Sequence, residues 1–314
     1  MKKTKILIIS KFADEIKRKL QEKDLYDAEV YYFKDQSSAE KEIEDADVLF
    51  CHGVSKEFLR KADNLKWIHT PWAGVDDLVD KIPKDVLFTR TIGINDVDIA
   101  RYVVSYILYF AQKIEKMQTF QEKKIWAFDI EKYNNFEENT VSVFGLGRIG
   151  KQIARSLDTL GFRVYGYKKH KTENNYNFIK KIYYKKQELL KISDYAVLSL
   201  PLTDETEKFI SKKEIEMMKT SSVLINIGRG ELIDEQDLIA ALKSNKIKAA
   251  VLDVFEKEPL PEKNELWNLE NVYVTPHIAG LFRFADRVNY FVDNLERFRN
   301  TEKLKGLVDL DEKY

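Results

Sequence analysis

The sequence predicts an α/β protein made of two doubly wound parallel sheets, each covered by helices on both faces. Short apolar runs alternate with longer helix-like stretches along most of the chain, which is the pattern of repeated β–α units. The runs are apolar throughout, as in strands that are buried on both faces of a sheet. The length of 314 residues is about twice that of an ordinary domain, so we expect two domains.

The N-terminal part of the chain contains five candidate strands. Each is a short apolar run bounded by polar or turn-forming residues. They are Lys5–Ser10, Ala28–Phe33, Asp47–Gly53, Leu65–Thr70 and Val86–Arg90. We expect these strands and the helices between them to form the first α/β sheet.

One long helix is expected to follow. Apolar residues recur at helical spacing from Ile99 to about Gln121, and neither proline nor glycine interrupts them. The stripe consists of Ile99, Val103, Ile107, Phe110, Ile114 and Met117.

A second series of apolar runs predicts the second sheet. The runs are Val141–Phe144, Phe162–Tyr167, Lys181–Tyr184, Tyr195–Leu200, Ser222–Ile227, Ala249–Val254 and Asn271–Thr275. The tail from Leu281 is helical again and is too short to form a domain alone. We therefore expect residues 95–280 to form one domain, inserted into a second domain made of residues 1–94 and 281–314.

Composition and charge exclude several kinds of protein. Lys plus Arg and Asp plus Glu both number 52, so no overall field would recruit nucleic acid or a membrane surface. The single cysteine, Cys51, can form neither an internal disulfide nor a thiolate metal cluster. The apolar runs Ile6–Ile9 and Tyr102–Ala111 are too short for a signal peptide and a membrane span, respectively. We therefore expect a cytoplasmic protein without a metal, nucleic-acid or membrane partner.

A glycine motif predicts a dinucleotide site. The run Val141–Phe144 leads into Gly145-Leu-Gly147-Arg-Ile-Gly150 and then into a helical stretch, which is the strand–turn–helix context that G-x-G-x-x-G requires. Gly145 permits the tight turn, Gly147 lets the backbone approach a pyrophosphate, and Gly150 allows close contact of helix and strand. The amide groups at the start of the helix would bind the phosphates. The alternative, for the bare string, is a glycine-rich turn without a ligand.

The end of the next strand indicates which dinucleotide binds. An acidic residue is expected there to bind the ribose 2′-hydroxyl of NAD. Here Phe162–Tyr167 is followed by Lys168-Lys169-His170-Lys171, so three lysines occupy the place of a 2′-phosphate. The pattern favours NADP over NAD; the alternative is a solvated lysine turn, with an acid from another loop serving NAD.

Three side chains that follow predicted strands form a candidate catalytic set. Arg229, Glu258 and His277 follow strands of the second series, and ligands of open α/β sheets bind at the carboxyl ends of strands. Arginine can bind a carboxylate and a carbonyl oxygen, histidine can protonate that oxygen, and glutamate can hold the imidazole. Taken singly, each could be structural: a surface arginine, a turn glutamate and a core histidine.

At these positions the sequence closely resembles the D-isomer-specific 2-hydroxyacid dehydrogenases, the family of glyoxylate and hydroxypyruvate reductases, D-lactate dehydrogenase and D-3-phosphoglycerate dehydrogenase. The matching strings occur in order along nearly the whole chain. They are Pro71–Asp76, Gly145–Gly150, Pro201–Thr203, Asn226–Gly230, Asp253–Pro259 and Thr275–Gly280. The resemblance implies a Rossmann dinucleotide-binding domain inserted in a flavodoxin-like substrate domain.

The resemblance also implies residue roles and an activity. Arg229 would bind substrate, His277 would act as general acid and base, and Glu258 would pair with His277. The backbone amides of Ala73, Gly74 and Val75 would hold the substrate carboxylate, in a cleft between the domains. Asp253 and the backbone near Ile227 would orient the nicotinamide amide. The remaining cofactor contacts implied are Gly145, Gly147, Arg148, Ile149, Gly150, Lys168, Lys169, Pro201, Thr206 and Gly280.

The expected reaction is the reduction of a small 2-keto acid to the (R)-2-hydroxy acid, or its reverse. The loop Phe50–Val54 should lie beside the carboxylate-binding turn and carries no arginine for a substrate phosphate. Glyoxylate, hydroxypyruvate or a short apolar acid is therefore favoured over 3-phosphohydroxypyruvate, although Arg283 or Arg287 could restore a phosphate site. The alternatives are D-3-phosphoglycerate dehydrogenase activity and a nicotinamide-sensing protein, similar to the transcriptional corepressors of this fold.

The resemblance further implies a homodimer, because the family's long helix before the glycine turn usually builds the subunit contact. The alternative is that the stripe from Ile99 to Met117 packs only within its own chain. Arg101 stands where many relatives carry an acidic residue. We have no functional account of Arg101.

Overall fold

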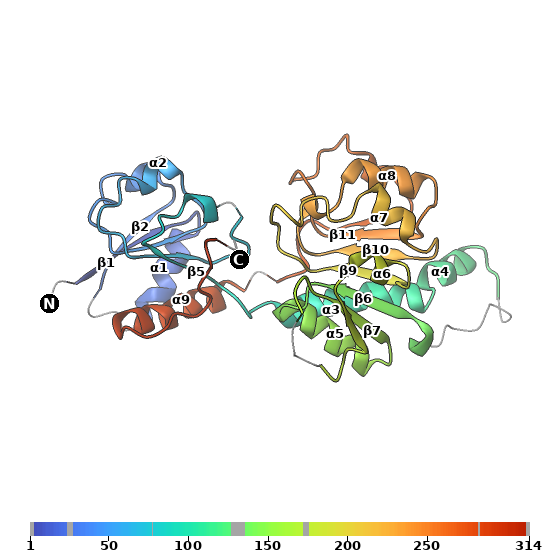
Figure 1. Ribbon diagram of the computed structural model, residues 1–314. Coiled ribbons are helices and arrows are strands. Elements are labelled where there is room, and N and C mark those ends of the chain that lie inside the picture. The colour runs from blue at the N-terminus through green and yellow to red at the C-terminus, as the bar shows by residue number, and fades with distance from the viewer. Residues whose placement is uncertain are drawn as a thin grey trace. The chain divides into compact units, whose positions relative to one another are not determined.

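The computed structural model describes residues 3–23, 28–76, 78–126, 136–171, 176–281 and 283–311. The chain divides into two compact units (Figure 1). Unit 1 comprises Met1–Ile94 and Arg283–Tyr314, and unit 2 comprises Asn95–Phe282. The second unit is thus an insertion in the sequence of the first.

Unit 1 is built on a five-stranded parallel sheet of order β2-β1-β3-β4-β5, the flavodoxin-like order. The strands are β1 (Thr4–Ile9), β2 (Ala28–Phe33), β3 (Val48–Cys51), β4 (Trp67–Thr70) and β5 (Leu87–Arg90). The α-helices are α1 (Ala13–Gln21), α2 (Lys56–Leu59) and α9 (Phe284–Arg299). Alternate residues of β1 pack into different cores: Ile6 and Ile8 pack with α1 and α9, and Leu7 and Ile9 pack with α2. The sheet is therefore buried on both faces, as the apolar runs predict.

Unit 2 is built on a seven-stranded parallel sheet of order β12-β11-β10-β9-β6-β7-β8. The strands are β6 (Thr140–Phe144), β7 (Arg163–Tyr167), β8 (Lys181–Tyr183), β9 (Tyr195–Leu198), β10 (Val223–Asn226), β11 (Ala249–Leu252) and β12 (Val272–Val274). Read from β8, this is the Rossmann order 3-2-1-4-5-6 with one strand added. The order reverses between β6 and β9, and ligands of such sheets bind at the carboxyl ends of the strands there.

Helices cover both faces of this second sheet. One face packs on α3 (Asp96–Ala111) and α5 (Arg148–Thr159). The other packs on α6 (Lys186–Leu190), α7 (Lys212–Met217) and α8 (Glu235–Lys243). The expected fold class of two doubly wound α/β sheets is confirmed, and all twelve expected strands are present.

The prediction of one helix from Ile99 to Gln121 is wrong. The helix α3 ends at Ala111, and α4 (Ile114–Glu122) begins after Lys113, whose φ of 53° is left-handed. A left-handed residue ends many helices, but it is usually glycine, so a lysine there leaves no sequence signal. The two parts of the apolar stripe differ in burial: Val103 and Ile107 of α3 are buried, whereas no residue of α4 is buried.

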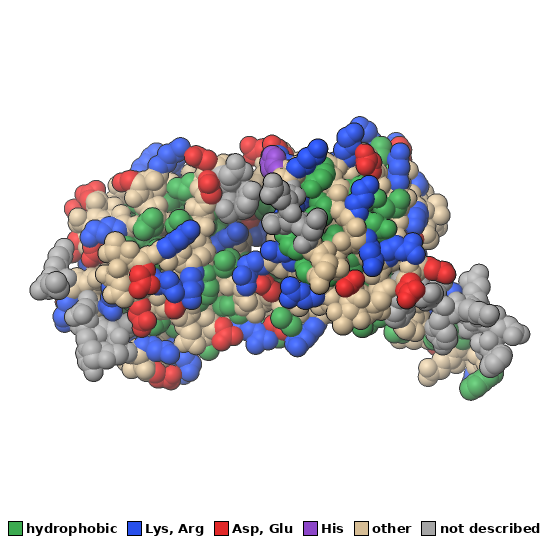
Figure 2. Space-filling view, turned by 60° about the horizontal axis from the view of Figure 1, so that its bottom comes forward, with side chains coloured by type: hydrophobic (Ala, Val, Ile, Leu, Met, Phe, Trp, Pro, Cys, Tyr) green, Lys and Arg blue, Asp and Glu red, His purple; other side chains and the backbone are tan. Residues whose placement is uncertain are grey.

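The surface carries no large region of one charge on the face that Figure 2 shows. Lysine and arginine side chains are interspersed with aspartate and glutamate over the described part of that face. Within the described ranges, no helix is both long and apolar enough to cross a membrane. The same residues contain no group of three or more histidine, cysteine or acidic side chains arranged to hold a metal ion.

Candidate active site

The glycine turn lies between β6 and α5. Gly145 has a φ of +97°, and a Cβ atom there would lie 2.4 Å from the carbonyl oxygen of Ser199. A Cβ atom on Gly150 would lie 1.9 Å from the carbonyl oxygen of Gly145, so both positions require glycine. A Cβ atom on Gly147, the N-cap residue of α5, would meet no described atom within 4 Å, so that side of the turn is open. The turn fits a pyrophosphate, which the first amide groups of α5 can bind.

Other predicted cofactor positions follow neighbouring strands of the same sheet. Ile149 packs against the core beside α3, and Arg148 donates from Nε to Asp96 at 3.0 Å. After β9, the Thr206 hydroxyl donates to the carbonyl oxygen of Pro201 at 2.7 Å and closes a turn. Ile227 follows β10, Asp253 follows β11 and Gly280 comes after β12. The sheet therefore gathers these positions at the carboxyl ends of its strands.

The lysines after β7 have different surroundings. The Lys168 ammonium group lies 5.7 Å from the ring centre of Tyr176, and Lys151 of α5 lies 5.8 Å from the same ring. Lys169 forms an ion pair of 2.5 Å with Glu205, which comes from the loop after β9. The sequence pattern could not place Glu205, because it lies 36 residues beyond Lys169 in a loop. The structure thus brings one acidic group to the lysine turn.

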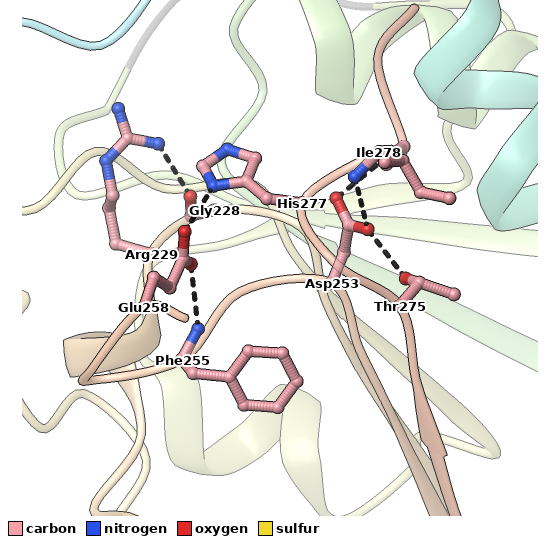
Figure 3. Close-up of polar contacts among 9 residues, drawn as sticks. Gly228, Arg229, Asp253, Phe255, Glu258, Thr275, His277 and Ile278 are labelled. Atoms are coloured by element: carbon pink, nitrogen blue, oxygen red, sulfur yellow. Dashed lines mark hydrogen bonds and ion pairs between the residues drawn. The ribbon is translucent and has the colours of Figure 1, made fainter. Parts of the chain in front are cut away.

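The structure brings Glu258 and His277 into contact. The Glu258 carboxylate lies 2.8 Å from Nδ1 of His277, and its other oxygen accepts a hydrogen bond of 3.1 Å from the amide of Phe255 (Figure 3). Because an ionised carboxylate only accepts hydrogen bonds, Nδ1 carries a proton and Nε2 is the atom that can exchange one. The His277 side chain is 54% exposed, so a small molecule can reach it.

Arg229 lies beside this pair (Figure 3). It follows β10, while Glu258 and His277 follow β11 and β12, the next strands in the sheet. Its Nη1 atom donates to the carbonyl oxygen of Gly228 at 2.7 Å. A Cβ atom on Gly230 would lie 1.9 Å from the backbone of Phe255, so Gly230 lets the Arg229 loop pack against the segment that carries Glu258.

The predicted carboxylate-binding turn follows β4 in unit 1. Two arginines donate hydrogen bonds to the backbone of this turn, and the sequence predicted neither contact. Arg90 donates to the carbonyl oxygen of Ala73 at 2.8 Å, and Arg287 of α9 donates to that of Pro71 at 2.5 Å. The Arg287 guanidinium also lies 4.5 Å from the ring centre of Trp72. The only sequence signal was their position, at the end of a strand and near the start of a helix.

The loop Phe50–Val54 lies beside this turn, as expected: the rings of His52 and Trp72 are 5.3 Å apart. Burial, together with the nearby charges of Arg287 and Lys11, lowers the pKa of His52 to about 4. His52 is therefore neutral at physiological pH and adds no positive charge to the turn.

Comparisons with known proteins identify the family of the chain. A model of the D-isomer specific 2-hydroxyacid dehydrogenase NAD binding domain matches residues 104–279. The chain is 33% identical over 249 residues to a D-3-phosphoglycerate dehydrogenase of Methanocaldococcus jannaschii and 35% identical over 235 residues to glyoxylate/hydroxypyruvate reductase B of Erwinia tasmaniensis. These alignments cover 76% and 72% of this chain, but 46% of the first relative and 73% of the second. The chain thus spans less than half the length of the first relative.

Solved structures share the whole fold. An NADPH-dependent glyoxylate/hydroxypyruvate reductase from Sinorhizobium meliloti, in complex with NADP and sulfate, is 25% identical with a TM-score of 0.88, over 99% of this chain and 100% of that one. A family protein from Aeromonas salmonicida subsp. salmonicida, described as D-isomer specific 2-hydroxyacid dehydrogenase, is 30% identical with a TM-score of 0.84, over 98% and 99% of the two chains.

Proposed function

Because the chain belongs to the D-isomer-specific 2-hydroxyacid dehydrogenase family, we propose that it reduces a small 2-keto acid to the (R)-2-hydroxy acid with a nicotinamide cofactor, or runs the reverse. Residues 104–279 match the family's NAD-binding domain. The observation that carries the proposal is the contact of 2.8 Å between His277 and Glu258. A histidine so oriented, and still exposed, is placed to exchange a proton with a bound substrate.

The proposed mechanism assigns a role to each of these residues. The cofactor, when bound, supplies the hydride that the carbonyl carbon accepts. Arg229 binds the substrate carboxylate and the carbonyl oxygen, and the backbone amides of Ala73, Gly74 and Val75 bind the carboxylate as well. His277 donates the proton of Nε2 to the carbonyl oxygen, and Glu258 holds the ring and stabilises its protonated form.

The surroundings of the turn support a choice of substrate class. Glyoxylate, hydroxypyruvate or a short apolar 2-keto acid is favoured. The loop Phe50–Val54 carries no arginine, Arg287 is buried against Pro71 and Trp72, and Arg90 donates to the carbonyl oxygen of Ala73. A relative is named D-3-phosphoglycerate dehydrogenase, so 3-phosphohydroxypyruvate is the second candidate.

The test is the rate of absorbance change at the nicotinamide band. Glyoxylate, hydroxypyruvate, 3-phosphohydroxypyruvate, pyruvate and 2-ketoisocaproate are each tested with NADPH and with NADH. A kcat/KM for 3-phosphohydroxypyruvate well above that for hydroxypyruvate would reverse the substrate order. Cofactor binding with no turnover of any acid would favour a nicotinamide-sensing protein.

We propose NADPH as the preferred cofactor. The ammonium groups of Lys168 and Lys151 lie 5.7 and 5.8 Å from the centre of the Tyr176 ring, and no acidic residue directly follows β7. Replacing Lys168 with alanine should raise the KM for NADPH by about 10- to 100-fold, because one charge-assisted contact to a phosphate contributes roughly 1.5–3 kcal/mol. The KM for NADH should change by less than about threefold, because NADH has no 2′-phosphate. Steady-state kinetics with both cofactors measure the effect.

Two further variants sharpen this prediction. Glu205→Gln removes the negative charge beside Lys169 and should lower the KM for NADPH. Lys191→Ala removes an exposed lysine after α6 and serves as the matched control. A wild-type KM for NADH at or below that for NADPH would show that the preference is wrong.

We propose a homodimer in which α4 takes part. No residue of α4 is buried, Ile114 is 39% exposed, and Trp126 just beyond the helix is 92% exposed. Light scattering should give about twice the chain mass of 36.9 kDa. Ile114→Glu should reduce the mass at micromolar concentration, because it places a charge in the contact, whereas Leu160→Glu, at another exposed apolar position, should not. A monomeric wild-type protein would refute the dimer.

A further inference from the structure

We infer that Asp253, Thr275 and Tyr102 are positioning residues that hold the loop carrying His277, residues 275–279, in its reactive conformation. The inference rests on the proposed role of His277 as general acid. It assigns Asp253 a task within the protein, in addition to the contact with the nicotinamide amide that the family resemblance implies.

The carboxylate of Asp253 binds this loop. Asp253 follows β11 and is only 2% exposed. Its Oδ1 atom accepts hydrogen bonds from the Thr275 hydroxyl at 2.6 Å and from the Ile278 amide at 2.9 Å (Figure 3). Its Oδ2 atom accepts one from the Ala279 amide at 2.9 Å. A carboxylate offers about four acceptor positions, so the loop occupies three of them.

The backbone of His277 has an unusual conformation. Its φ is 55°, in the left-handed region that residues other than glycine seldom adopt. Its amide donates to the carbonyl oxygen of Asp253 at 2.9 Å, and also to that of Thr275. A conformation of this kind persists only where surrounding contacts impose it. The Asp253 backbone and carboxylate supply these contacts immediately before and after His277, while the imidazole turns to Glu258.

The hydroxyl groups of Tyr102 and Thr275 extend this network to helix α3. The hydroxyls of Tyr102 and Thr275 lie 2.6 Å apart. Thr275 has a single hydroxyl proton and donates it to the Asp253 carboxylate, so the proton between the two hydroxyls must come from Tyr102. Burial raises the pKa of Tyr102 well above its usual value, so Tyr102 keeps its proton at ordinary pH. Helix α3 thus anchors the loop through a chain from Tyr102 to Thr275 to Asp253.

The positioning role and the nicotinamide role predict different losses. If the hydrogen bonds from Tyr102 through Thr275 to Asp253 position His277, removing one of them lowers kcat and leaves cofactor affinity unchanged, because no cofactor contact is removed. If the task of Asp253 is to bind the nicotinamide amide, disturbing the carboxylate weakens cofactor binding. Thr275→Val removes the hydroxyl that links Tyr102 to Asp253 and keeps a β-branched side chain of similar shape.

The experiment compares Thr275→Val, Thr275→Ser and Tyr102→Phe with the wild-type enzyme. We expect Thr275→Val to lower kcat for hydroxypyruvate with NADPH by about 10- to 100-fold, since a small displacement of a catalytic group has effects of that size. Thr275→Ser keeps the hydroxyl and should stay within about threefold, and Tyr102→Phe should fall between the two. The Kd for NADPH, from quenching of protein fluorescence, should change less than twofold in all three. Thermal unfolding confirms that each variant is folded.

A double-mutant cycle separates positioning from general damage. In the His277→Ala background, adding Thr275→Val should lower the remaining rate by less than twofold, because the group that it positions is already absent. A full additional loss, an unchanged kcat for Thr275→Val alone, or a rise in the NADPH Kd that matches the loss of rate would each overturn the inference. A wild-type protein that binds NADPH and turns over no 2-keto acid would overturn the proposed function and the inference with it.

Discussion

Replacing His277 with alanine is expected to lower kcat for 2-keto acid reduction by about 10²- to 10⁴-fold, the contribution typical of a general acid. Nδ1 of His277 faces Glu258 at 2.8 Å, so in the proposed mechanism Nε2 is the atom that would protonate the substrate. Without the ring, water must protonate the carbonyl oxygen as the hydride arrives. The loss should appear in kcat, while the KM for NADPH changes little, because no cofactor group depends on the imidazole.

Single-turnover kinetics with saturating NADPH measure the chemical step directly. Glu258→Gln is the companion variant: it keeps a side chain of the same size but removes the charge that stabilises the protonated ring. It should lower kcat less than His277→Ala does, because the imidazole that exchanges the proton remains. A kcat for His277→Ala within about threefold of wild type would exclude this histidine as the acid, whatever the variant of Glu258 does.

The strands were predictable because a strand that is buried on both faces of a sheet is apolar at nearly every residue. The run Val223–Asn226 is buried throughout, and its neighbours in the sheet are equally apolar. The glycine turn was predictable because Gly145 and Gly150 leave no room for a side chain, which restricts the residue type. Positions just after such strands were therefore the right places to look for polar side chains.

The missed features depend on contacts between residues far apart in the sequence. The bond between Tyr102 and Thr275 spans 173 residues, and the one between Arg287 and Pro71 spans 216. Each partner alone is an ordinary helix or loop residue, so no local pattern marks it. The break at Lys113 was missed for a different reason: its backbone is left-handed although the residue is not a glycine, so its residue type does not mark the end of the helix.

Replacing Arg229 with leucine is expected to lower kcat/KM for hydroxypyruvate by about 10²- to 10⁴-fold. The guanidinium group would bind both the carboxylate and the oxygen on which charge develops, and two charge-assisted hydrogen bonds contribute roughly 3–6 kcal/mol together. Both KM and kcat should change, because the proposed carboxylate contact would exist before the reaction and the proposed contact to the carbonyl oxygen would strengthen during it.

The lysine variant distinguishes charge from geometry. Arg229→Lys keeps the positive charge but offers a point donor in place of a planar fork, so it should recover only part of the lost kcat/KM. Arg163→Lys, at an exposed position in β7, is the matched control and should leave the kinetics unchanged. If Arg229→Lys restores kcat/KM fully, the site needs only a positive charge there. If Arg229→Leu leaves kcat/KM near that of wild type, Arg229 does not bind the substrate.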